Sequence, residues 1–178
     1  MECISKGKAR QPYEFGVKAS FAVTAHKGLI VGARSFPGNP YDGDTLAEQF
    51  EQTAILTDTP VKTALVDLGY RGLEVEGIRT LHRGKPKRMS KAEKRLLKRR
   101  QAVEPSIGHL KADHRMRRNF LKGVQGDAIN PILAAAGFNI RWLMRWLVVF
   151  WRWILSAALR LMGQSDSDAR SDLASAAA

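Results

Sequence analysis

The alternation of apolar and polar side chains predicts a strand near the start of the chain. From residue 13 to residue 23 every second side chain is apolar, and the positions between them include Glu14 and Lys18. Alternate residues of a strand point to opposite faces, so this pattern is typical of a half-buried strand. Residues 26–28 read as a turn, and residues 29–36 are expected to return as the second strand of a hairpin.

A helix and a buried strand are expected next. Residues 45–48, Thr-Leu-Ala-Glu, have the form of a capping box that opens a helix running to about Leu56, and Pro60 prevents its continuation. Residues 61–66 are a short apolar run suited to a buried strand, which ends at Asp67.

The second half of the chain is expected to be helical. A second capping box, Ser90-Lys91-Ala92-Glu93, opens a basic helix that Pro105 kinks or restarts, because proline lacks the N–H that a helix interior needs. We expect the helix to continue past Pro105 with a kink. The order hairpin, helix, strand, basic helix, apolar helix predicts a mixed α/β fold. The expected organisation is a disordered start (1–12), a core (13–125), a carboxyl-terminal helical region (126–163) and a disordered tail (164–178).

A long apolar segment, residues 128–163, raises the question of a membrane. Four arginines interrupt it, and no charge-free run approaches the roughly 20 residues of a membrane span. Each central Arg would cost about 2.5–3.5 kcal/mol on insertion. On a helix Arg141, Arg145 and Arg152 fall within about 40° of one another, which predicts an amphipathic helix with a basic stripe. The preferred interpretation is a core helix with one solvent-exposed edge and no membrane contact. A membrane-surface helix is the alternative, because four tryptophans flank the arginines.

The positive charge is concentrated in one quarter of the chain. The net charge is +12. Residues 79–122 carry sixteen Lys or Arg against three acids, a net of +13, so the remainder is close to neutral. A concentration of this kind predicts a polyanionic partner, with nucleic acid first. The alternative, a disordered basic linker, is disfavoured by apolar residues at helical spacing within the block. The single cysteine, Cys3, excludes an intramolecular disulfide, and the start lacks the apolar stretch of a signal peptide, so a cytoplasmic location is expected.

Two acidic residues are candidates for metal chemistry. Asp67 follows a predicted buried strand, where α/β sheets place their ligands. Glu104 lies within the basic block, and on a helix Arg100, Glu104 and Lys111 would share a stripe about 40° wide. A carboxylate bracketed by cations stays ionised and can hold Mg²⁺. The alternatives are an ion pair between Glu104 and Arg100, and a turn-forming role for Asp67. The residues by themselves leave these open.

Four stretches resemble the transposases of bacterial insertion sequences. They are YEFGVKAS (13–20), PGNPYDGDTL (37–46), VDLGYRG (66–72) and RRQAVEPSIGHLKADHRMRRNFLKG (99–123). In about residues 4–145 the chain resembles the DDE type, which has a ribonuclease-H-like core. The resemblance implies that Asp67 and Glu104 are the second and third catalytic carboxylates and ligands of Mg²⁺ or Mn²⁺. It also implies that the partner is DNA at transposon ends. The basic residues expected to contact DNA are Arg99, Arg100, Lys111, Arg115, Arg117 and Arg118.

The chain departs from this family at two places. The family's helix signature has a Tyr where Leu97 stands, and the family's first catalytic Asp lies on a strand upstream of the hairpin, where this chain has no Asp. Asp42, Asp44 and Glu14 are disfavoured as substitutes, since turn, helix-start and strand-end roles suit them better.

The sequence therefore predicts a truncated ribonuclease-H-like core followed by an amphipathic helix, in a transposase fragment that is inactive alone. The alternative is a non-catalytic DNA-binding protein. A homo-oligomer and a full-length transposase are the candidate protein partners.

Overall fold

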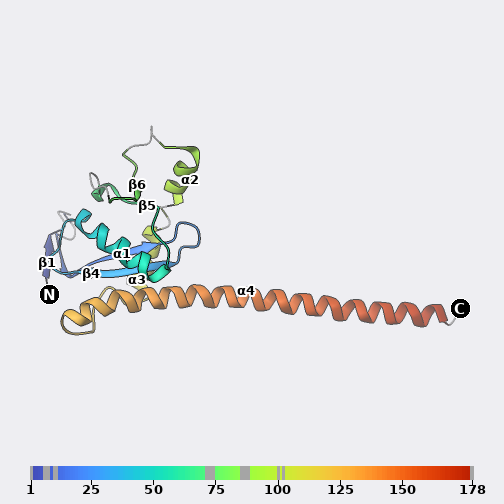
Figure 1. Cartoon of the computed structure of the whole chain (residues 1–178). Helices are drawn as coiled ribbons and strands as arrows, with labels where there is room; N and C mark the ends of the chain where they lie inside the picture. Colours follow the sequence, from blue (N-terminus) through green and yellow to red (C-terminus); the bar gives the residue numbers. More distant parts are fainter. Residues whose placement is uncertain are drawn as a thin grey trace. The chain divides into compact units, whose positions relative to one another are not determined.

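Most strands lie in the first half of the chain and most helices in the second, and the strands form small sheets, so the fold is mixed α/β (Figure 1). The computed structural model describes residues 2–5, 9, 12–70, 75–84, 89–99, 101 and 103–176, with side chains as far as residue 161. The strands are β1 (Glu2–Ser5), β2 (Tyr13–Gly16), β3 (Lys18–Val23), β4 (Ile30–Phe36), β5 (Thr63–Leu65) and β6 (Arg79–Leu81). The helices are α1 (Leu46–Thr57), α2 (Lys91–Arg99), α3 (Val103–Ala112) and α4 (Gly123–Ala176), with 3-10 turns η1 (Gly43–Thr45) and η2 (Leu68–Tyr70). Two units are distinguished, Met1–Asn139 and Ile140–Ala178.

The predicted hairpin is present as β3 and β4, which are antiparallel with Phe21 opposite Ala33. The strand expected over residues 13–23 is interrupted, because Gly16 has a φ of 144°, in a region that favours glycine. Its first part, β2, pairs instead with β1. Residues 2–5 therefore form a strand within the range where the sequence predicts disorder. Their alternation of half-buried and exposed positions extends over only four residues, too few to give a clear sequence pattern.

Two side-chain amides occupy one edge of β4. The amide of Gln52, on α1, accepts from the Ala33 N–H (3.0 Å) and donates to the Ala33 carbonyl (3.2 Å). The amide of Asn139, on α4, accepts from the Ile30 N–H (2.9 Å) and donates to the Ile30 carbonyl (2.8 Å). Each amide supplies the donor and acceptor that a neighbouring strand would supply. This edge of the hairpin is therefore protected at both residues against pairing with another strand.

A second, parallel strand pair carries Asp67 at its end. β5 pairs with β6, with Ala64 opposite Thr80. The strand expected over residues 61–66 is shorter than predicted, although the Val66 N–H still donates to the Leu81 carbonyl at 2.9 Å. No sequence pattern predicts β6, because three residues in a stretch rich in Arg, Lys and Gly give no periodicity.

Two apolar clusters hold the first unit together. One joins the hairpin, α3 and the start of α4 through Ile30, Ala33, Leu110, Ala134 and Ala135. The other joins α1 to the end of β5 through Leu46, Phe50 and Val66. Leu110 is only 1% exposed, so α3 is anchored against the hairpin and α4 by its most buried side chain.

The two predicted capping boxes have different outcomes. The one at α2 is confirmed: the Glu93 N–H donates to Ser90 Oγ at 3.2 Å, and the Ser90 N–H donates to Glu93 Oε2 at 2.7 Å. The one at α1 is wrong. The Thr45 hydroxyl donates to the Asp42 carbonyl at 2.6 Å instead of capping the helix, and Glu48 pairs with Arg34. The turn η1 precedes α1 and already has helical geometry, so position 45 is not a helix start.

The Ser90–Glu93 box predicts a pH response at the start of α2. The Ser90 backbone N–H, then the Ser90 hydroxyl and Arg79, hold the pKa of Glu93 below its ordinary value. Because the folded-state pKa is depressed, this stabilisation is fully present above the ordinary Glu pKa and is lost as the pH falls through the folded pKa. Amide exchange in the first turn of α2 should accelerate on acidification over that window. The Glu93→Gln variant should not show the acceleration, and an unchanged exchange rate in the parent chain would contradict the assignment.

The basic region forms two helices where the sequence predicts one kinked helix. α2 ends at Arg99 and α3 begins at Val103. Pro105 is the third residue of α3, within the first turn, where its missing N–H has no intrahelical partner to lose. The break therefore lies before Glu104 rather than at the proline. Arg100, which the sequence places on one stripe with Glu104, lies outside the described residues.

α4 begins as a core helix and continues with an apolar surface. Ala134 and Ala135 are 3% and 7% exposed, so the core-helix interpretation holds for the first turns. From Ile140 to Leu161 most of the large apolar side chains are exposed, and there the core-helix interpretation stays a prediction. Residues 123–161 are long and apolar enough to cross a membrane by length and composition, and only 11% of the apolar window is buried. The helix also extends to Ala176, through residues for which the sequence predicts a disordered tail.

Candidate nucleic-acid interface

Five of the six basic residues expected to contact DNA lie on α2, α3 and the loop that follows. Arg99 is the last residue of α2 and is exposed, and Lys111 lies half-buried in the last turn of α3. Arg115, Arg117 and Arg118 are exposed in the loop between α3 and α4. The sixth, Arg100, lies outside the described residues.

Local hydrogen bonds hold the loop after α3 in place. The Met116 N–H donates to the Leu110 carbonyl at 3.2 Å, which folds the chain back over the end of α3. Arg115 between them has a φ of 57°, in the left-handed region that non-glycine residues seldom adopt. Further along, Asn119 donates to Asp127 Oδ1 at 2.7 Å and accepts from the Leu121 N–H at 2.9 Å. The loop is thus tied to both helices and presents its arginines on a fixed frame.

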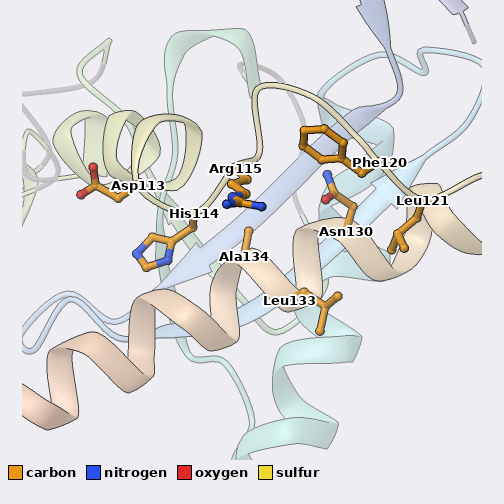
Figure 2. A pocket seen from close by; sticks show the side chains of 8 residues that line it. All are labelled: Asp113, His114, Arg115, Phe120, Leu121, Asn130, Leu133 and Ala134. Carbon is orange, nitrogen blue, oxygen red and sulfur yellow. The ribbon is translucent and has the colours of Figure 1, made fainter.

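An open pocket of about 330 Å³ lies between this loop and the first turns of α4. Its walls combine a cation, an aromatic ring and an amide, and Figure 2 shows them coming from the end of α3, the loop and α4. The lining residues are Asp113, His114, Arg115, Phe120, Leu121, Asn130, Leu133 and Ala134. Phe120 is 66% exposed, and the Arg118 guanidinium lies 5.6 Å from its ring centroid. Guanidinium groups and exposed aromatic rings are the groups that contact phosphates and unpaired bases.

Gly126 lies where α4 approaches this loop closely. A Cβ at residue 126 would lie 2.7 Å from the backbone carbon of Leu121, and backbone cannot move aside as a flexible side chain can. We expect Gly126→Ala to lower the free energy of unfolding by about 1–3 kcal/mol. Urea unfolding measures this.

The control for Gly126→Ala is Gly108→Ala, since residue 108 is in α3 and has nothing within 4 Å of its Cβ. That variant should be neutral or more stable by up to about 1 kcal/mol, because alanine favours a helix over glycine. Equal effects of the two substitutions would contradict the close approach of residue 126 to the loop.

Asp67 lies on an exposed turn after β5. Its Oδ1 accepts from the Leu68 N–H at 2.7 Å, at the start of η2, which is the turn-forming role considered as an alternative. Burial, and then the negative charges of Asp42 and Asp67, raise the pKa of Tyr70. Asp42 Oδ2 would lie 3.0 Å from a Cβ at Gly69. The structure therefore brings Asp42 to the loop of Asp67, although the two are far apart in sequence.

The sequence favours a turn role for Asp42 over a catalytic role, and no sequence pattern predicts this proximity. Asp42 also forms an ion pair with Lys18, at 2.8 Å. Residue 42 lies in a dense run of turn formers. The position of its carboxylate in the fold cannot be predicted there, since no periodic pattern indicates where a loop folds back.

Glu104 is exposed in the first turn of α3, where the helix dipole favours a negative charge. In the part of the chain that the structure describes, no group of three or more His, Cys, Asp or Glu could hold a metal ion. His109 and Asp113 form a pair at 2.9 Å on the same helix. The described residues therefore do not fit a two-metal centre. The metal-binding and catalytic roles of Asp67 and Glu104 stay predictions.

The family comparison matches the part of the chain that contains these basic elements. Residues 69–144 match the family model of the transposase DDE domain. The matched segment, under half of the chain, includes Glu104 and all of the DNA-contact candidates, and it begins just after Asp67. Residues 69–144 are therefore similar to a transposase DDE domain, and the resemblance to DDE transposases is confirmed. No curated protein and no solved structure matches the chain.

Proposed function

We propose that this chain is a fragment of a cytoplasmic DDE transposase that binds DNA through the region from α2 to the start of α4. The observation that carries the proposal is the overlap of the transposase match with the basic block in the sequence. The transposase match at residues 69–144 contains the basic block at residues 79–122, which holds the net positive charge of the chain. The transposase match supports a role in DNA transposition, and the charge supports a phosphate backbone as the partner.

The order of elements supports a truncated ribonuclease-H-like core. An antiparallel hairpin (β3 and β4) is followed by α1, then by β5 with Asp67 at its end, and then by the helix that carries Glu104. These elements follow the order hairpin, helix, strand and basic helix that the sequence predicts for the core. The strand pair β5 and β6 is parallel, which is the arrangement of strands in α/β sheets whose ligands lie at the carboxyl ends.

We further propose that the isolated chain binds DNA without cutting it. Mg²⁺ or Mn²⁺, held by carboxylates from separate elements, would supply the charge stabilisation for phosphodiester cleavage in this family. Asp67 and Glu104 are the candidates here, and among the described residues no group of three or more His, Cys, Asp or Glu could hold a metal ion. What the chain's own residues supply is a cationic surface: Arg115, Arg117 and Arg118 would position the backbone of the bound duplex.

Salt-dependent DNA binding tests the first part of this proposal. The affinity of the full chain for a random-sequence duplex should fall steeply with salt, and the logarithmic plot should have a slope of about −0.9 for each phosphate neutralised. Fluorescence anisotropy of a labelled duplex measures it. An affinity that does not change with salt would refute DNA binding through the basic block.

Plasmid nicking tests the second part. Supercoiled plasmid should stay intact when it is incubated with the chain and Mn²⁺. Nicking that disappears in the Glu104→Gln variant would show that the chain is catalytically competent and would refute the inactivity, while leaving the DNA-binding role in place.

A further inference from the structure

The apolar surface of α4 between Ile140 and Leu161 has a one-sided charge composition. From residue 128 to residue 163 the sequence contains four arginines and no acid. Large apolar side chains in this part are widely exposed, with Trp151 at 63% and Trp153 at 67%. An apolar helix surface of this extent needs a covering partner, since single exposed apolar residues are ordinary but a continuous surface is not.

A second copy of the helix would cover only one face. One line of apolar side chains repeats in heptad fashion: Ile140, Leu143, Leu147, Phe150, Ile154, Ala157 and Leu161. The side of the helix opposite this line, between residues 141 and 159, carries Arg141, Arg145 and Arg152. It also carries large apolar residues: Trp142, Val148, Val149, Leu155 and Leu159. Of these, Val149 and Leu155 are 60% and 61% exposed. A helical partner along the heptad line would leave these residues in water, so the pattern favours a surrounding that contacts most of the helix circumference.

We propose that the Ile140–Leu161 part of α4 lies in the surface of an anionic lipid bilayer. A bilayer interface accommodates apolar side chains on most of the circumference and a cationic stripe on the remainder. Arg141, Arg145 and Arg152 lie within about 40° of one another around the helix, so a helix parallel to the membrane places all three guanidinium groups at the headgroups together.

A helix that crosses the membrane would not do this. Arg141 and Arg152 are about 16 Å apart along the helix axis, and Arg145 lies between them. A crossing orientation would therefore bring at least one of the three toward the hydrocarbon interior, where a charged side chain is costly.

The segment from residue 128 to residue 163 has arginines but no acidic side chain, which favours an anionic lipid. Phosphate headgroups of an anionic lipid complement the arginines, whereas a second copy of the same segment brings no negative charge. A DNA backbone offers the same charge but no apolar phase for the exposed Trp and Leu side chains. An anionic bilayer offers both.

Tryptophan fluorescence of the full chain tests the proposal. All four tryptophans of the protein, Trp142, Trp146, Trp151 and Trp153, lie in this segment, so the emission reports on it alone. Addition of phosphatidylcholine vesicles with phosphatidylglycerol should shift the emission to shorter wavelength. Brominated lipids should quench it most when the bromine lies near the headgroups. Vesicles of phosphatidylcholine alone should give a weaker response.

The charge contribution is tested with a double variant, Arg145→Gln/Arg152→Gln. Loss of two basic residues from an anionic surface should lower the vesicle partition coefficient about 30-fold. The control is Lys27→Gln/Lys62→Gln, which removes the same charge from exposed positions outside α4 and outside the basic block. It should leave the tryptophan response at a given lipid concentration nearly unchanged.

Three outcomes would overturn the proposal. Tryptophan emission that does not shift when anionic vesicles are added would show that lipid does not cover the helix, even if the basic block binds the vesicles. A concentration-dependent blue shift without lipid, together with oligomers in sedimentation equilibrium, would show that a second copy covers it. Strongest quenching by bromine at the bilayer centre would show a crossing helix. None of these results bears on salt-dependent DNA binding, so the proposed function is tested separately.

Discussion

The triple variant Arg115→Gln/Arg117→Gln/Arg118→Gln is expected to lose most of its affinity for duplex DNA. Each arginine that neutralises a phosphate releases a counterion, and three lost contacts should lower the logarithmic salt slope by about 2.7. At low salt the affinity should fall by about two orders of magnitude. All three side chains are exposed on a loop that hydrogen bonds tie to α3 and α4, so their removal leaves the surrounding packing intact. Anisotropy titrations at a series of salt concentrations measure both quantities.

The control removes charge from another part of the surface. Lys27→Gln/Lys62→Gln changes two exposed cations outside residues 79–122 and should alter the salt slope much less than the loop variant. An unchanged slope in the loop variant, or equal changes in both, would mean that the positive charge acts only as a diffuse field and that this loop does not contact the backbone.

A substitution at Arg115 can separate an effect on DNA affinity from an effect on the stability of the fold. Its φ of 57° is a conformation in which a side chain is unfavourable and glycine is not. Arg115→Gly should therefore leave the free energy of unfolding unchanged or raise it by up to about 1 kcal/mol, while it weakens DNA binding. A variant that gains stability as it loses affinity identifies the side chain as a contact. If stability and affinity fell together, the arginine would have a structural role.

The parts of the fold that sequence predicts are those with a local cause. Apolar alternation predicts β3, the turn after it predicts the returning strand β4, and the Ser90–Glu93 pair predicts the start of α2, because the interactions involved span at most a few residues. The same reasoning fails at Thr45, where the capping motif is present but the preceding 3-10 turn has already begun the helical geometry. A motif therefore predicts a cap only if the chain before it is non-helical, and this depends on tertiary contacts.

The parts that sequence does not predict depend on side chains that act across the fold. Nothing local to Gln52 or Asn139 indicates that their amides hydrogen-bond to the edge of β4, 19 and 109 residues away in sequence. The proximity of Asp42 to the loop of Asp67 is of the same kind. The candidate site is therefore predicted in its residue types and in its charge. The arrangement of its carboxylates is not, because loops between short strands determine it.

The largest effect on stability is expected from Leu110→Ala. Leu110 is 1% exposed and belongs to the cluster that joins β4, α3 and α4. Truncation of a leucine in such a site removes its transfer free energy and leaves a cavity, which lowers the free energy of unfolding by about 2–5 kcal/mol. Urea unfolding followed by circular dichroism measures this. Leu133→Ala is the matched control, because Leu133 is 59% exposed on α4, and it should change stability by no more than about 0.5 kcal/mol.

The Leu110→Ala variant also tests how the basic loop is supported. Leu110 anchors α3 through its side chain and accepts the Met116 N–H through its backbone carbonyl, so the side chain that stabilises the core lies on the turn from which the loop begins. Folded Leu110→Ala protein should bind DNA more weakly than the parent chain with a similar salt slope, since the arginines are retained but less firmly positioned. A leucine truncation that cost no stability would mean that the hairpin, α3 and α4 do not share a core. The fixed frame inferred for the DNA-contacting loop would then be wrong.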